Sequence, residues 1–72
     1  MALTQRKTIL PAAAMEKLLK KAGATRVSAD AKDKMIEVLE EIAEEIGEKA
    51  IRLAKHAGRK TIKSADIKEA TK

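Results

Sequence analysis

The sequence predicts an all-α protein in which a short helix, a long helix and another short helix follow one another, joined by two loops. Three observations lead to this prediction. Apolar residues recur at helical spacing through one long segment, residues 28–57. A glycine follows each of the first two apolar segments, as is typical of helix ends. Phe, Tyr, Trp and Cys are all absent, so the core must be built from small and aliphatic side chains, which suits close-packed helices.

Residues 1–10 show no clear period and carry Arg6 and Lys7. We interpret them as a flexible basic tail that precedes one folded domain, residues 11–72. Two alternatives remain open for this tail: disorder without a function, or a basic arm that touches a nucleic acid.

The first short helix begins at Pro11, because proline is favoured in the first turn of a helix, and it ends at Gly23. Its apolar face is predicted to contain Ala14 or Met15, Leu18, Leu19 and Ala22.

The long helix has Ser28 as its expected N-terminal cap and Gly58 as its C-terminal stop. A helix of about 28 residues is roughly 42 Å long. A compact monomer of this chain length would be only about 30 Å across. Because the apolar stripe runs the whole length of the helix, a second chain is needed to cover it. We therefore predict an obligate dimer whose core is shared by two long helices.

A last short helix follows, with Ser64 as its expected cap. The two loops have a similar order of residue types, since GATRVS and GRKTIKS each run from glycine through a basic and a β-branched residue to serine. In an antiparallel dimer, the first loop of one chain would meet the second loop of the other. Arg26 would then lie beside Lys60 and Thr61 across the interface.

The net charge is +5, from 16 basic and 11 acidic residues, which indicates a polyanionic partner. Eight of the eleven acids lie between Asp30 and Glu48, so the long helix has an acidic middle and basic ends. The missing aromatic residues argue against base stacking on single strands and against membrane-interface anchoring. We expect a soluble cytoplasmic protein, since the sequence shows neither a signal peptide nor a transmembrane run.

The acidic middle of the long helix holds six glutamates between Glu37 and Glu48. Several of them are like-charge pairs four residues apart, which are mildly destabilising. They form either a solvated face or a surface that keeps a polyanionic partner on the basic side and meets lysines of neighbouring molecules. Gly47, inside this helix, either allows close approach of a partner helix or is a tolerated weak point.

The motifs AGATRVS and LAKHAGRKTIKSADI, together with the proline-led first helix, resemble an archaeal histone over Pro11 to about Ala70. This resemblance implies a histone fold, a head-to-tail handshake dimer, and wrapping of duplex DNA with little sequence specificity. Stacking of dimers along DNA, chromatin compaction and association with the nucleoid would follow. The alternative is a histone-fold dimerisation module of a transcription-related complex, but such a module does not need the basic loops.

The resemblance also implies roles for individual residues. The expected DNA-binding residues are Lys17, Lys20, Arg26, Lys60, Thr61 and Lys63. Arg59 and Asp66 are expected to form an intrachain clamp on the second loop. The expected contact between neighbouring dimers involves Leu53, His56, Asp66 and Glu69.

Each of these roles has a simpler alternative. Arg26 and Thr61 are also ordinary types for a solvated loop, and Arg59 with Asp66 could form a common surface pair. His56 suits the C-terminal end of a helix whether or not it contacts another dimer. Glu69 stands where the family often has an apolar residue, so assembly beyond the dimer remains open, as does the choice between a homodimer and a heterodimer with a paralogue.

An enzymatic function is not expected. The sequence shows no nucleophile–base pair, no cluster of metal ligands and no glycine-rich phosphate loop, so we predict neither a cofactor nor a metal site.

Overall fold

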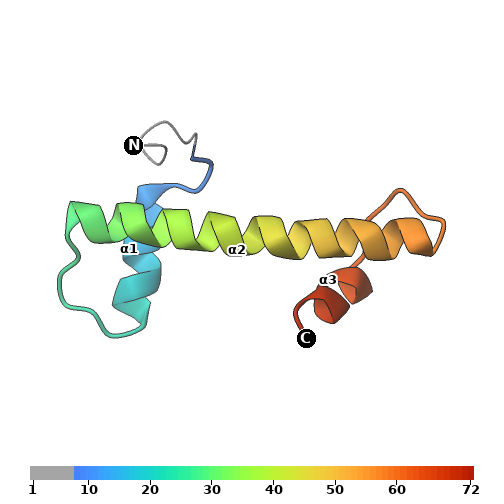
Figure 1. Ribbon diagram of the computed structural model, residues 1–72. Coiled ribbons are helices and arrows are strands. Elements are labelled where there is room, and N and C mark those ends of the chain that lie inside the picture. Colours follow the sequence, from blue (N-terminus) through green and yellow to red (C-terminus); the bar gives the residue numbers. More distant parts are fainter. Residues whose placement is uncertain (1–7) are drawn as a thin grey trace. The chain divides into compact units, whose positions relative to one another are not determined.

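The computed structural model describes residues 8–72, in which three α-helices follow one another (Figure 1). These are α1, Ala12–Lys21, α2, Ala29–His56, and α3, Ser64–Ala70. No β-strand occurs in residues 8–72. The predicted order of a short, a long and a short helix is confirmed. Residues 1–7 of the predicted tail lie outside the described residues.

Both loops begin with the same backbone motif. After α1, the N–H groups of Gly23 and Ala24 donate to the carbonyls of Lys20 and Leu19, each at 3.0 Å. After α2, the N–H groups of Gly58 and Arg59 donate to the carbonyls of Lys55 and Ala54, at 2.9 and 2.8 Å. This crossed pair of bonds is the Schellman motif, which requires a left-handed residue; Gly23 has φ 119° and Gly58 has φ 75°. The internal repeat seen in the sequence is therefore a repeat of helix-stop geometry.

The two following helices start differently. The hydroxyl of Ser28 accepts the N–H of Ala31 at 3.2 Å and caps α2 as predicted. Ser64, however, is the first residue of α3, and Lys63 occupies the N-cap position. The prediction that Ser64 caps α3 is wrong, because the Asp66 carboxylate accepts the N–H of Lys63 at 2.8 Å and supplies the reciprocal bond instead.

The chain divides into two compact units, Met1–Glu40 and Glu41–Lys72, and α2 runs through both. Among the described residues of the first unit, Met15 of α1 and Ile36 of α2 are the buried apolar side chains, and Glu40 is also buried. In the second unit, the buried apolar residues are Ala50, Ala54 and Ala70, so small side chains let α3 approach α2 closely.

A large part of the apolar stripe of α2 is left uncovered in the single chain. Val38 and Ile42, four residues apart on one face of the helix, are 41% and 47% exposed. The buried residues Ile36, Ala50 and Ala54 come from another side of the same helix. Thus α2 has, besides the positions that carry its buried residues, apolar side chains that are exposed in the single chain.

Candidate nucleic-acid interface

The second loop is held together by Arg59 and Asp66. The Arg59 guanidinium donates two parallel hydrogen bonds to the Asp66 carboxylate, from Nη1 to Oδ2 at 2.9 Å and from Nη2 to Oδ1 at 3.0 Å. A third bond from Arg59 Nη1 reaches the carbonyl of Thr61 at 2.9 Å. The side chains are 31% and 7% exposed, so this bidentate pair is partly shielded from water and is stronger than an ordinary surface pair.

The electrostatics of the pair follow from these contacts. The hydrogen bonds from Arg59 lower the pKa of Asp66 to about 2, and the N–H of Lys63 contributes in the same direction. In return, the hydrogen bond to Asp66 raises the pKa of Arg59. Asp66 therefore stays ionised down to acidic pH and joins the loop to the first turn of α3.

The predicted DNA-contacting residues of the second loop lie on this fixed backbone. Lys60, Thr61 and Lys63 are all exposed, whereas Arg59 and Asp66 turn inward towards each other. A cationic loop whose backbone is already ordered in the free protein suits phosphate binding, because little conformational entropy is then lost when the phosphate binds.

The first loop presents Arg26 as an exposed side chain, two residues before the Ser28 cap. The Ser28 hydroxyl also donates to the Asp30 carboxylate at 2.6 Å, which lowers the pKa of Asp30. Val27, between Arg26 and Ser28, is half-buried. The predicted meeting of Arg26 with Lys60 and Thr61 involves two protomers, so it stays a prediction.

On α1, the two predicted phosphate contacts differ. Lys17 and Lys20 are both exposed, but Lys20 forms an ion pair with Glu16 at 3.1 Å. Glu16 is also 3.4 Å from Lys32 of α2, and the hydrogen bonds from both lysines lower its pKa. Glu16 was not among the residues predicted from the sequence, although its spacing of four residues from Lys20 is a recognised signal for such a pair.

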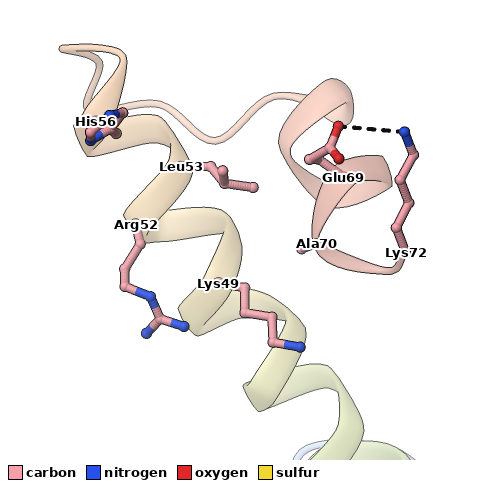
Figure 2. A pocket seen from close by; sticks show the side chains of 7 residues that line it. All are labelled: Lys49, Arg52, Leu53, His56, Glu69, Ala70 and Lys72. Carbon is pink, nitrogen blue, oxygen red and sulfur yellow. Dashed lines mark ion pairs between the residues drawn. The ribbon is translucent and has the colours of Figure 1, made fainter.

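The predicted dimer–dimer residues are only partly brought together. A hollow of about 510 Å³ lies in the second unit, lined by Lys49, Arg52, Leu53, His56, Glu69, Ala70 and Lys72 (Figure 2). Leu53 projects from α2 towards α3, and Glu69 is turned to Lys72, 3.6 Å away. Asp66 does not line this hollow, because its carboxylate is occupied by Arg59 and Lys63.

Two further findings concern residues 8–72 as a whole. No helix there is both long enough and apolar enough to cross a membrane. Within the same range, no group of three His, Cys, Asp or Glu side chains is placed to hold a metal ion.

A short–long–short set of helices with a basic loop after each Schellman motif defines a histone-fold class of protein. The family described as "Histone-like transcription factor (CBF/NF-Y) and archaeal histone" matches residues 8–71. One subunit of the archaeal histone HAN1 of Thermococcus zilligii is 52% identical over 63 residues, which cover 88% of this chain and 94% of that protein. Probable archaeal histone 3 of Methanocaldococcus jannaschii is 56% identical over 61 residues, covering 85% and 91%. The DNA-binding protein HmvA of the same organism is 39% identical over 61 residues, covering 85% and 64%.

The chain belongs to this family of histone-like transcription factors and archaeal histones. It is a histone-fold DNA-binding protein of the kind that dimerises through that fold and compacts chromatin, and its association is with the chromosome. The similarity to archaeal histones favours this function over that of a dimerisation module in a transcription-related complex.

Proposed function

We propose that this chain forms a homodimer that wraps duplex DNA with little sequence preference, through a paired set of loops at each end of the dimer. The observation that carries the proposal is the second loop. There, the Arg59–Asp66 pair fixes the backbone and leaves Lys60, Thr61 and Lys63 exposed. Arg26 of the first loop completes each pair by entering the minor groove, where an arginine responds to groove shape and potential more than to base identity.

The uncovered side of α2 supports the dimer. Val38 and Ile42 lie on a helix of 28 residues and are 41% and 47% exposed in the single chain. Burying such side chains contributes roughly 1.5–3 kcal/mol each, which a second copy would supply reciprocally. The proposed pairing is head to tail, so that each first loop meets the second loop of the other protomer. A heterodimer with a paralogue is the alternative occupant of the same face.

The homodimer is tested by Ile42→Glu, which would place a carboxylate in the middle of the proposed interface. We expect the dimer dissociation constant to rise at least about 100-fold in sedimentation experiments. Ile9→Glu is the matched control, because Ile9 is already 88% exposed. Equal dimerisation of the two variants would contradict the proposed interface, whereas a wild-type chain that stays monomeric alone would point to a paralogue.

The function itself is tested by nuclease digestion of the protein bound to long random-sequence duplex DNA. Protected lengths that increase by a constant step would support dimers adding one after another along wrapped DNA. A single protected length would mean isolated dimers or a closed particle. No protection at low salt would overturn the proposal and favour the interaction module. The proposal assigns an architectural role without catalysis, at the nucleoid in the cytoplasm.

Assembly beyond the dimer is proposed to use the hollow around Leu53 and His56, with Glu69 as its weak point. Glu69 places a charge at the rim of this hollow and is exposed. Glu69→Leu should therefore increase the number of successive protected DNA lengths in the nuclease digestion, while Glu41→Leu on the acidic part of α2 should not. The same set of protected lengths for both variants would exclude Glu69 from the contact between dimers.

A further inference from the structure

One carboxylate on α1 contacts two lysines that come from different helices. Oε2 of Glu16 lies 3.1 Å from the Nζ of Lys20, one turn later on α1. Oε1 of the same side chain accepts a hydrogen bond of 3.4 Å from the Nζ of Lys32, near the start of α2. Both oxygens of Glu16 are therefore occupied by cations, one on each side of the first loop.

Glu16 is an exception in the charge pattern of this part of the chain. Between residues 8 and 29, the sequence has four basic residues and one acidic residue, Glu16. The four basic side chains are all exposed: Lys17, Lys20, Lys21 and Arg26. A stretch of this composition attracts phosphate groups, and Glu16 is the one negative charge within it.

The two ion pairs of Glu16 affect charge more than stability. The side chains of Glu16, Lys20 and Lys32 are 37%, 51% and 25% exposed, and ion pairs in contact with water stabilise a fold little. The hydrogen bonds from Lys20 and from Lys32 lower the pKa of Glu16, so its carboxylate stays ionised and offsets part of their positive charge. A phosphate oxygen is an anionic acceptor of the same kind, so it can bind either lysine only by displacing or sharing Glu16.

We propose that Glu16 competes with DNA phosphates for Lys20 and Lys32, and thereby limits the affinity of the first helix and the first loop for duplex DNA. The inference rests on the proposed function, because it requires the duplex to contact this surface. Lys17 differs from Lys20, since it is exposed and belongs to no ion pair within residues 8–72. Neighbouring residues of a helix do not face each other, so Lys17 stays available to phosphate although it follows Glu16 in the sequence.

The competition is tested by Glu16→Gln, which keeps the shape of the side chain and removes its charge. Glu41→Gln, at an exposed position of α2, is the matched control for the change in net charge. Relative to that control, the dissociation constant of Glu16→Gln for random-sequence duplex DNA should fall about fivefold near ~0.1 M salt. The slope of log affinity against log salt concentration should become steeper by up to about 0.9 for each phosphate that is newly neutralised. Equal affinities of the two variants, with melting temperatures that show both to be folded, would overturn the proposal.

A second experiment asks whether Lys20 is the cation that Glu16 withholds. In the wild type, Lys20→Ala should make the salt slope shallower by much less than about 0.9, whereas in the Glu16→Gln background the change should approach that value for each phosphate lost. Lys17→Ala is the control, because its effect should be the same in both backgrounds. Equal effects of Lys20→Ala in the two backgrounds would contradict the competition.

The ion pairs themselves are tested without DNA, by following the titration of the Glu16 carboxyl group with NMR. Its pKa should rise in Lys20→Ala and in Lys32→Ala, because each substitution removes a hydrogen bond that lowers it. A pKa that is unchanged in both variants would overturn the competition by removing its source. Failure of the wild-type protein to bind duplex DNA would refute the proposed function, whereas wild-type binding that Glu16→Gln does not strengthen would refute the competition alone.

Discussion

The two loops of this protein begin with the same backbone motif but differ in the side-chain contacts that hold them. Each starts with a Schellman motif at a glycine in the left-handed region, Gly23 or Gly58. The first loop then ends at an exposed serine cap, whereas the second is tied by the bidentate Arg59–Asp66 pair. We propose from this comparison that the second loop is already ordered before DNA binds, whereas the first loop adjusts on binding.

The largest expected effect in this comparison is that of Asp66→Asn. The substitution removes the charge that holds Arg59 and weakens the bond to the Lys63 N–H, so the melting temperature should fall by several degrees or more. Thermal unfolding followed by circular dichroism measures it. Glu69→Gln removes the same charge from an exposed position of the same helix and should have little effect. A similar small change in both variants would mean that the second loop is no better organised than the first.

The same variant makes a pH prediction. Because the pKa of Asp66 is lowered from 3.8 to about 2 in the folded protein, its stabilising effect is present above the unfolded value and is lost as pH falls towards 2. The difference in melting temperature between wild type and Asp66→Asn should therefore be constant above about pH 4 and shrink between pH 4 and pH 2. A difference that stays constant across that range would contradict the assigned ion pair.

The next largest effect is expected at Gly23 and Gly58, which supply the backbone motif that the two loops share. Alanine at Gly23 or Gly58 has space for its Cβ but must adopt a positive φ, which costs roughly 1–2 kcal/mol. Gly47→Ala is the matched control, since it adds the same methyl group inside α2, where nothing lies within 4 Å of it in the chain. It should stabilise the protein by about 1 kcal/mol through helix propensity. Loss of stability at Gly47 would instead show that a partner helix approaches there.

A substitution of Arg26 tests the proposed contribution of the first loop to DNA binding. Arg26→Ala should raise the dissociation constant about tenfold on every duplex sequence, since the protein loses one exposed cation per protomer. The slope of log affinity against log salt concentration should become shallower by about 0.9 for each phosphate that is no longer neutralised. Affinity measured at several salt concentrations on two unrelated sequences checks this. Lys34→Ala removes the same charge from the acidic stretch of α2 and serves as the control. A loss of binding confined to one of the two sequences would show base readout instead of shape readout.

Much of this fold could be predicted because its signals are local. Helical spacing, the two glycine stops and the Ser28 cap each depend on residues a few positions apart, and the structure has all of them. The Ser64 cap failed for an equally local reason, since Asp66 two positions later supplies the competing bond. Arg59 and Asp66 were singled out by family resemblance, because spacing alone does not distinguish a shielded bidentate pair from a surface pair.

Glu40 could not be predicted from its sequence position. Two of the groups that bind it are backbone N–H groups about 30 residues away, and every residue except proline has such a group, so no residue type marks these two contacts. By composition it belongs to the solvated acidic face, and only the fold of α1 against α2 separates it from its exposed neighbours.

The smallest expected effect concerns the Ser28 cap at the end of the first loop. Ser28→Ala removes the acceptor for the Ala31 N–H and should lower the free energy of unfolding by about 0.5–1 kcal/mol. This is the lower part of the usual range, because the site is exposed. Chemical denaturation measures this, with Ser64→Ala as the matched control, since Ser64 makes no cap bond and its loss should change stability much less. If the first loop adjusts on binding, Ser28→Ala should also leave DNA affinity nearly unchanged, because DNA contacts rather than the cap would then order Arg26. A large loss of affinity with a small loss of stability would mean that the serine cap organises the first loop for DNA, as the arginine–aspartate pair is proposed to do in the second.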